Sequence, residues 1–431
     1  MMDKKRITFE NIILLFVCYV FYGLFDLKGL IILIAMSAFT YLGGKSIIDS
    51  RNANDEKRAR MYCAMFIATQ IAFLCFFKYF SPTLPVGMSF YMLMAISFLV
   101  DCEKGHFEEL PTVIETLIFI SFFPTILSGP ILKAHDFIPQ IASRQKITKE
   151  RLTRGVWLIA IGLFMKLCLA DRLGVSVDKV YATPLVFSGA TLFITSISYS
   201  LQLFFDFAGY SNMAIGVATI LGFDISANFN LPYMATNPSE FWNRWHISLS
   251  SWLKEYVYIP LGGNRKGITR TYINILLVMI VSGLWHGSTI NFLIWGILHG
   301  VGQMVHRAVF GKRKDAKSTG AVRILSMILN FLFVNFLWIP FRAKTLSDTW
   351  TIIKRIATFA EGASYFYVYT FIFGIMLIIV QFIGAKFNNG NDPIRPLPFD
   401  KFYAKVIFCA LIIATAMFAY FGSGAFIYSQ F

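Results

Sequence analysis

Long, nearly uninterrupted runs of apolar residues divide the chain into segments of similar length. Several of these runs approach the roughly 20 apolar residues that an α-helix needs to cross a lipid bilayer. Because the runs are continuous and do not alternate between apolar and polar positions, they predict membrane-spanning helices and not the strands of a β-barrel. The predicted spans cover residues 8–25, 29–47, 61–80, 85–101, 153–170, 184–205, 207–223, 271–285, 289–309, 322–341, 365–385 and 403–422.

A further apolar stretch, residues 111–132, differs from these runs. It contains Pro111, Pro124, Gly129 and Pro130, and prolines and glycines disfavour one straight helix. Cytoplasmic loops of membrane proteins carry an excess of Lys and Arg. By this rule, the segments before and after the stretch are both expected in the cytoplasm. We therefore expect a broken or re-entrant element that bends near Pro124 or Gly129. The alternative is an ordinary crossing that violates the charge rule.

Composition and charge support a membrane protein. Of the 431 residues, 56% are hydrophobic and 15% are charged, whereas a soluble domain carries roughly 25% charged residues. The formal net charge of +15 is scattered over loops. This is typical of Lys and Arg on the cytoplasmic side, and it does not indicate a nucleic-acid-binding face. We predict an all-α polytopic protein with about 11–13 transmembrane helices, including re-entrant and interfacial elements.

The basic loops also predict an orientation. The basic N-terminus, the loop after the second span and the loop at 311–320 are expected inside, and the tight turn at Asp26 and Lys28 is expected outside. The first apolar run lacks a clear cleavage site and is expected to remain as an anchor. The longest polar linker, residues 384–401, precedes the last span.

One polar stretch, residues 237–265, is unusual in so apolar a chain. It contains the sequence FWNRWHISLSSWLKEYVYIPLGGNR. A charged group at mid-bilayer costs roughly 2.5–3.5 kcal/mol on insertion scales, so this stretch should lie at an interface or in a wet cavity. Asn237 or Ser239 is a suitable helix cap. We expect an amphipathic helix with Phe241, Trp245 and Trp252 on one stripe, anchored at the interface by its tryptophans until IPLGGNR ends it.

His286 is the strongest candidate for chemistry. It follows Arg270 by sixteen residues, about 24 Å as a helix, and this places it deep in the membrane beside a turn at Gly283 and Gly287. Ionisable residues inside a membrane are costly and usually have a function, so His286 is expected to have one. Imidazole has an unperturbed pKa of about 6.5 and can accept and return a proton near neutral pH.

Metal and nucleophile chemistry have less support in the sequence. His286 and His299 are thirteen residues apart and would lie on different faces of one helix, and no carboxylate is spaced for a shared site. We therefore expect no metal site and no bound cofactor. No GxSxG motif is present, which disfavours a Ser–His–Asp triad.

Several motifs together resemble the bacterial branch of the membrane-bound O-acyltransferase family. The polar stretch above is followed by SGLWHG, and the other matching segments are LPVGMSFYMLMAISFLVD, SFFPTILSGPI, HDFIPQ and LQLFFDFAGYSNMAIG. They occur in order over residues 84–300, and the expected domain is the whole chain, 1–431, with the family core at about 84–310.

The resemblance implies roles for individual residues. His286, in the WHG motif, would be the catalytic base, and His246, in RWHIS, is the second candidate. Trp285 would form a wall of the site. His299, which belongs to the family-like motif LHG, is a weaker candidate for a role in the site. Substrate binding is expected from Asn243, Arg244, Lys254 and Arg265. The three cations among them would attract an anionic acyl donor. The alternative for these cations is a structural role at the membrane interface. The family also implies a central funnel or tunnel that admits the donor. As an alternative to an interfacial anchor, the polar stretch at 237–265 would then line the cytosolic mouth of this tunnel, with its tryptophans at the rim.

The implied reaction is transfer of an acetyl group from acetyl-CoA, or from the phosphopantetheine of an acyl carrier protein, to a hydroxyl of an exported or cell-wall polysaccharide. The bacterial cell membrane is the implied location, and an extracytoplasmic acetyltransferase is an implied partner. One alternative is D-alanyl transfer from a carrier protein toward teichoic acid. The other is a lipid or acyl transporter without chemistry, which the absence of visible internal symmetry disfavours.

Overall fold

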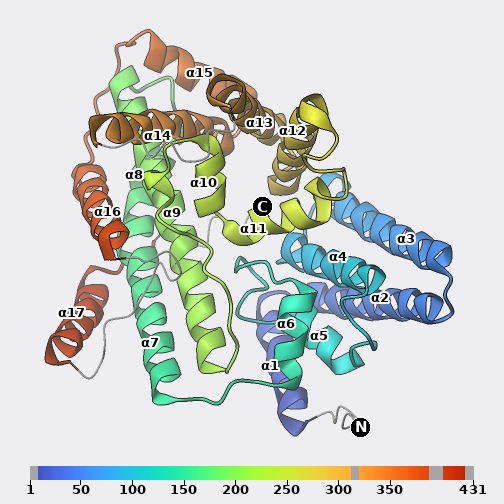
Figure 1. The fold of residues 1–431 in the computed structure, drawn as a ribbon. Helices are drawn as coiled ribbons and strands as arrows, with labels where there is room; N and C mark the ends of the chain where they lie inside the picture. Colours follow the sequence, from blue (N-terminus) through green and yellow to red (C-terminus); the bar gives the residue numbers. More distant parts are fainter. Residues whose placement is uncertain (1–7, 312–319, 388–400, 423–431) are drawn as a thin grey trace. The chain divides into compact units, whose positions relative to one another are not determined.

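The computed structural model describes residues 8–311, 320–387 and 401–422, and these residues are almost entirely helical (Figure 1). An isolated bridge between Phe187 and Ala363 is the β-structure among them. The basic N-terminal residues 1–7, most of the loop at 311–320 and most of the linker at 384–401 lie outside the described residues. The prediction of an all-α membrane protein is confirmed.

The chain divides into two compact units. The first comprises Met1–Val156 with Ala214–Ser226. Its elements are α1 (Phe9–Phe25), α2 (Leu27–Asn52), α3 (Glu56–Cys75), η1 (Phe76–Phe80), α4 (Met88–Lys104), α5 (Val113–Ser121) and α6 (Ala134–Ala142). Helix α7 (Lys149–Phe164) and helix α9 (Gly189–Ile220) contribute residues to both units. The expectation of one functional domain stays a prediction.

The second unit comprises Trp157–Met213 with Ala227–Phe431. It begins with η2 (Met165–Ala170) and α8 (Asp171–Ala182), followed by most of α9, η3 (Pro232–Met234), α10 (Pro238–Arg244), α11 (Ile247–Leu253) and η4 (Lys254–Tyr258). The remaining helices are α12 (Gly267–His286), α13 (Ile290–Phe310), α14 (Gly320–Arg342), α15 (Leu346–Ala357), α16 (Val368–Phe387) and α17 (Phe402–Phe418).

Six helical segments in the described residues are long and apolar enough to cross a membrane: Leu27–Asn52, Glu56–Phe80, Lys149–Ala182, Gly189–Ile220, Gly267–His286 and Gly320–Arg342. Three shorter apolar helices are Phe9–Phe25, Val368–Gly384 and Phe402–Phe418. The predicted spans 184–205 and 207–223 are wrong as separate elements, because they form the single helix α9. The total of 11–13 crossings stays a prediction.

Apolar side chains cover the outside of several helices. Along α16 the exposed residues are Phe371, Ile372, Ile375, Ile378, Ile379 and Phe382. A water-soluble surface rarely exposes so continuous an apolar band. This arrangement is expected for helices that face lipid.

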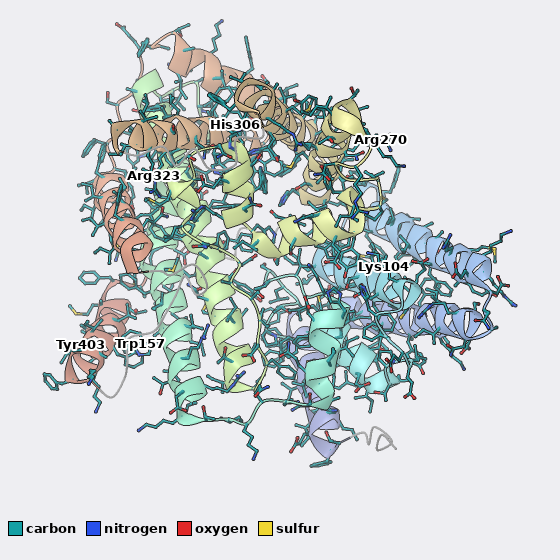
Figure 2. All side chains as sticks on the ribbon, in the orientation of Figure 1. Lys104, Trp157, Arg270, His306, Arg323 and Tyr403 are labelled. Carbon is teal, nitrogen blue, oxygen red and sulfur yellow. The ribbon has the colours of Figure 1, made fainter. Side chains whose placement is uncertain are left out.

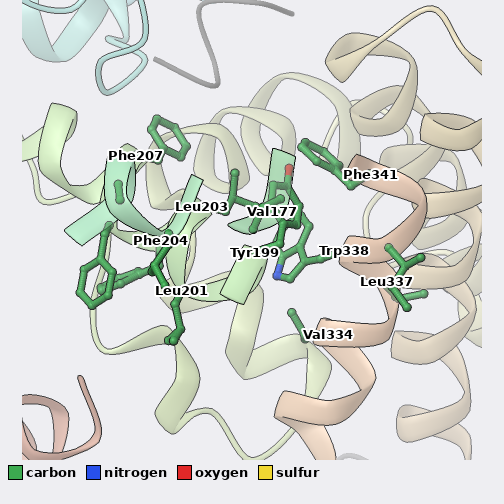
Figure 3. Close-up of a cluster of buried hydrophobic side chains, with 14 of the residues drawn as sticks. Val177, Tyr199, Leu201, Leu203, Phe204, Phe207, Val334, Leu337, Trp338 and Phe341 are labelled. Carbon is green, nitrogen blue, oxygen red and sulfur yellow. The ribbon is translucent and has the colours of Figure 1, made fainter. Parts of the chain in front are cut away.

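The core of the second unit lies between α8, α9 and α14 (Figure 3). The buried residues Val334, Leu337, Trp338 and Phe341 follow the spacing of one helix face. Figure 3 shows them beside Tyr199 and Leu203 of α9 and Val177 of α8.

A buried ion cluster also links the elements of this unit. Lys166 Nζ lies 2.7 Å from Asp171 Oδ1 and 2.6 Å from Asp206 Oδ1, and all three side chains are buried. Charges in a membrane protein are tolerated when they pair with one another inside the bundle. The cluster therefore connects η2 and α8 with α9.

The apolar stretch 111–132 is broken, as predicted. Helix α5 begins at a capping box in which Thr112 accepts from Glu115 N and the Glu115 carboxylate accepts from Thr112 N. It ends at Ser121, three residues before Pro124, and residues 122–133 are not helical. Pro124 explains the end, because the residue before a proline is disfavoured in the α region. Whether the element re-enters the membrane stays a prediction.

Candidate active site

His286 is the last residue of α12, where that helix meets α13. The two helices run side by side (Figure 1), and Gly287 caps α12 by donating its backbone N–H to Gly283 O. Their close approach requires glycine: a Cβ at Gly283 would lie 2.3 Å from Phe292 O, and one at Gly296 would lie 2.3 Å from Met279 O. Backbone packing of the two helices therefore fixes the position of His286.

Aromatic rings surround the buried imidazole of His286, which is 2% exposed. Its ring centroid lies 4.9 Å from that of Trp285, 5.1 Å from that of Trp295 and 5.2 Å from that of Phe341. All three contacts are edge-to-face, the geometry favoured by the quadrupole of aromatic rings. The predicted burial is confirmed, and the polar cavity expected beside His286 stays a prediction.

His246 lies at a break between α10 and α11. Its backbone is left-handed, with φ 45° and ψ 54°, a conformation that is uncommon for a residue other than glycine. The single amphipathic helix expected over this stretch is therefore wrong. The start was predicted correctly, since Asn237 caps α10 by accepting from Glu240 N and Pro238 is the first helical residue.

Asn228 holds this break in place. Its backbone carbonyl accepts from Ile247 N at 2.9 Å, and its side-chain Oδ1 accepts from Ser248 N at 3.1 Å. The same Oδ1 lies 3.2 Å from His246 Nδ1. Because an amide oxygen only accepts, Nδ1 must carry the proton, and Nε2 is then the basic nitrogen.

His246 is completely buried and lies outside the helices that are long and apolar enough to cross a membrane. Burial lowers the pKa of its imidazole to about 3, because the charged form loses its hydration. The ring is therefore neutral at physiological pH.

His299 lies on α13 and is completely buried. Trp242 Nε1 donates to His299 Nδ1 at 3.3 Å, so the neutral ring carries its proton on Nε2. Within the described part of the chain, the Nε2 of His299 and the Nε1 of Trp295 are buried without a hydrogen-bond partner. Unpartnered buried donors are rare in proteins and often mark a site where a ligand or a water binds.

The structure joins the three histidines through tryptophan rings. The centroid of Trp285 lies 6.3 Å from His246 and 4.9 Å from His286, and Trp295 lies 5.1 Å from His286 and 4.9 Å from His299. His286 and His299 belong to two different helices, α12 and α13, and not to two faces of one. The sequence did not predict that Trp295 and Asn228 belong to this site, because no local motif distinguishes them from other core residues.

The tryptophans of the polar stretch face the protein interior and not lipid. Trp242, Trp245 and Trp252 are all buried, and Trp245 packs 5.5 Å from Phe241 and 5.2 Å from Trp338, centroid to centroid. The expectation that they act as interfacial anchors is wrong. Their rings instead contribute to the core of the second unit.

The predicted substrate-binding residues separate into two groups. Arg244 donates to Glu240 at 2.9 Å and to Asn230 O at 3.1 Å, which ties the end of α10 to the preceding loop. Burial opposes ionisation of Glu240, but hydrogen bonds from Thr236 and the charge of Arg244 hold its pKa below the usual value. Asn243, Lys254 and Arg265 are exposed, so the structure does not bring them into the ring cluster around His286.

A second group of possible metal ligands lies in the first unit. Although the sequence offers no carboxylate spaced to share a site with His286 and His299, the Asp101 carboxylate lies between His106 and His135. All three residues belong to the first unit.

Comparisons with known proteins agree with the motifs. The sequence model of the membrane-bound O-acyltransferase family matches residues 15–346. A peptidoglycan O-acetyltransferase of Helicobacter pylori is 32% identical over 394 residues, which cover 81% of this chain and 74% of that protein.

Two further relatives represent the branches considered above. A probable alginate O-acetylase of Azotobacter vinelandii is 32% identical over 375 residues, covering 82% of this chain and 74% of that protein. A teichoic acid D-alanyltransferase of Bacillus subtilis is 30% identical over 277 residues, covering 60% of this chain and 69% of that protein. The match over most of the chain and its apolar helices lead to one conclusion: the chain is a multi-pass membrane acyltransferase that belongs to the membrane-bound O-acyltransferase family.

Proposed function

We propose that this protein transfers an acetyl group from a cytosolic thioester to a hydroxyl of an exported or cell-wall polysaccharide. The thioester would be acetyl-CoA or the phosphopantetheine of an acyl carrier protein, used as a substrate. The observation that carries the proposal is the position of His286, buried at the junction of α12 and α13 and linked through tryptophan rings to His246 and His299.

His286 would act as the general base. Its imidazole takes the proton of the acceptor hydroxyl as the oxygen attacks the thioester carbonyl carbon. The carbon–sulfur bond then breaks, an ester forms, and the thiolate leaves and receives the proton from the imidazolium. No metal or bound cofactor is needed for this sequence of steps.

Two unpartnered donors of the ring cluster support this chemistry. The attack places negative charge on the carbonyl oxygen, and donors fixed at that point lower the barrier. Trp295 Nε1–H and His299 Nε2–H are buried donors of this kind, and the Trp295 ring contacts the His286 ring. Because the protein interior holds them in place, they would need little reorganisation during the reaction.

The choice of acetyl over D-alanyl rests on similarity. The relatives named for O-acetylation match 81–82% of this chain, whereas the D-alanyltransferase matches 60%. D-alanyl transfer from a carrier protein remains the second candidate. For acetylation, an acetyltransferase on the outer side of the cytoplasmic membrane would receive the group or pass it to the polymer.

The test uses inside-out membrane vesicles that contain the full chain. They are incubated with acetyl-CoA labelled in the acetyl group or with a D-alanyl carrier protein, and both free thiol and alkali-labile label on polymer are measured. We expect thiol release and ester label from acetyl-CoA. Release from the D-alanyl carrier alone would favour the second candidate, and release from neither donor above empty vesicles would overturn acyl transfer from these thioesters.

Variants then test the catalytic assignment. Replacing His286 with alanine should lower the rate about 10²–10⁴-fold, the usual contribution of a general base, without removing the protein from the membrane. His306→Ala is the matched control. His306 (labelled in Figure 2) lies on the neighbouring helix α13, and its ring contacts Phe310 instead of the ring cluster. A His286→Ala variant with near-normal kcat would show that the assignment is wrong and would make His246 the next residue to test.

A further inference from the structure

Three side chains of the first unit meet at the end of α4. Asp101 belongs to the last turn of α4, His106 follows that helix and His135 lies in the first turn of α6. Lys104 marks the end of α4 in Figure 2. Asp101 is fully buried, whereas the side chains of His106 and His135 are 37% and 25% exposed. The cluster therefore has a buried carboxylate and an accessible side.

The two imidazoles share one carboxylate. His106 Nδ1 lies 3.1 Å from Asp101 Oδ1, and His135 Nδ1 lies 2.9 Å from Asp101 Oδ2. The ring centroids are 4.9 Å apart. One possible ligand atom from each residue lies within 4.8 Å of the others.

Side-chain movements of up to about 1.5 Å would convert this arrangement into a coordination site. Ligand atoms about 2.0–2.1 Å from a tetrahedral zinc ion are about 3.3 Å apart. The two Nδ1–Oδ distances of 3.1 and 2.9 Å are close to this value, and a pair of ligand atoms at the 4.8 Å limit would have to approach by about 1.5 Å. Two imidazoles and one carboxylate are a ligand set that suits Zn²⁺ and similar transition metals. The accessible side leaves a fourth position for water.

The surroundings of His135 match those of a metal ligand. When one nitrogen of a histidine binds a metal, the other usually donates to a carboxylate, a backbone carbonyl or a water, which fixes the ring orientation. His135 Nε2 lies 3.4 Å from Asp136 Oδ1. The carboxylate is fixed as well, because His135 N donates to Asp101 Oδ2 at 3.0 Å.

We propose that Asp101, His106 and His135 bind a divalent transition metal ion, with Zn²⁺ as the best fit, and that the ion ties the end of α4 to the start of α6. These two helices flank the broken element formed by α5 and residues 122–133 in the chain. The metal site is separate from the proposed active site, and it stands or falls independently of the acyl-transfer proposal. The competing interpretation is a hydrogen-bonded triad in which both imidazoles donate to Asp101 without a metal.

Metal content measured on the purified full chain distinguishes the two interpretations. The protein carries no oligohistidine tag, is stripped with a chelator in detergent, is loaded with Zn²⁺ and is freed of excess ion before elemental analysis. We expect about one ion per chain in the wild type and in His306→Ala. Co²⁺ in place of Zn²⁺ should give the visible absorption of a tetrahedral site.

Variants at the cluster make the result specific. His106→Gln replaces a partly exposed side chain and should fold, while Asp101→Asn keeps the shape of the carboxylate and removes its charge. Both should lose the ion, and Asp136→Asn should weaken binding about 10–100-fold. If the wild type retains no more zinc than His106→Gln, or if cobalt shows no tetrahedral spectrum, the metal site is excluded and the hydrogen-bonded triad remains.

Discussion

At the residue scale, the imidazoles of His246 and His286 are held in place by different kinds of contact. His246 is held by Asn228 in a left-handed conformation with a fixed proton position. His286 is held by aromatic contacts at a helix end. Rare backbone conformations cost of order 1–3 kcal/mol and tend to persist at functional sites. We therefore expect His246 to help position the substrate beside His286, the proposed base.

The low pKa of His246 predicts a pH-dependent stability. In the unfolded chain a histidine has a pKa of about 6.5, whereas burial lowers that of folded His246 to about 3. Between these values the unfolded chain binds the additional proton. Stability is therefore complete above pH 6.5 and falls by up to about 1.4 kcal/mol for each pH unit below it.

Thermal unfolding in detergent at pH 7.5, 6.5 and 5.5 checks this prediction. A His246→Gln variant can still donate to Asn228 but cannot be protonated, so its unfolding temperature should fall less steeply with acid than that of the wild type. Because other histidines remain in both proteins, the comparison uses the difference between the two slopes. Equal slopes would contradict the prediction.

The cations near the polar stretch should differ in effect. Lys254 and Arg265 are exposed, so we expect Lys254→Ala and Arg265→Ala to raise KM for the anionic donor and to leave kcat nearly unchanged, because uniform binding is lost. The effect should shrink as salt increases, since exposed charges are screened beyond about 8 Å at physiological ionic strength.

Arg244→Ala serves as the contrast. Arg244 pairs with Glu240 and the loop at Asn230, and its loss should lower stability and kcat together, independently of salt. Steady-state kinetics at two salt concentrations separate the two patterns. A salt-independent KM for Lys254→Ala and Arg265→Ala would indicate that these cations do not attract the donor.

At the scale of elements, the contact between α12 and α13 controls the position of His286. A methyl group at Gly283 would collide with the backbone carbonyl of Phe292, which cannot rotate away as a side chain can. We expect Gly283→Ala to cost about 1–3 kcal/mol of stability, as overpacking usually does, and to lower kcat by moving His286.

Gly374→Ala is the matched control for this prediction. A Cβ at Gly374 in α16 would lie 3.6 Å from Leu201 Cδ1, an ordinary van der Waals contact. Its unfolding temperature and activity should equal or exceed those of the wild type, since alanine favours a helix over glycine. If both variants behave alike, the close approach of α12 and α13 does not determine the site.

At the scale of the whole molecule, the charge pattern predicts how the chain crosses the membrane. Residues on both sides of the broken element should be cytoplasmic, and the turn at Lys28 should be external. Glu108, Lys146 and Lys28 are exposed positions suited to single cysteines. A membrane-impermeant maleimide applied to intact cells should label Lys28→Cys, and Glu108→Cys and Lys146→Cys should react when the cytoplasmic side is opened. Reaction of Glu108→Cys and Lys146→Cys from opposite sides would show that residues 111–132 cross the membrane.

The sequence by itself determined the class of protein and the elements that depend on local pattern. Continuous apolar runs predict helices because lipid offers no partner for the backbone. The cap at Asn237, the break before Pro124 and the buried histidine at the end of α12 also follow from neighbouring residues. These features were predicted because their causes lie within a few positions along the chain.

Tertiary structure decided the features that join distant residues. Asn228 turns the chain at His246, eighteen positions later, and no helical periodicity reveals such a break. Lys166 meets Asp206, and Asp101 meets His135, across 40 and 34 positions. The tryptophans of the polar stretch fill a core instead of anchoring an interface, because a large ring suits either place and only the packing around it decides.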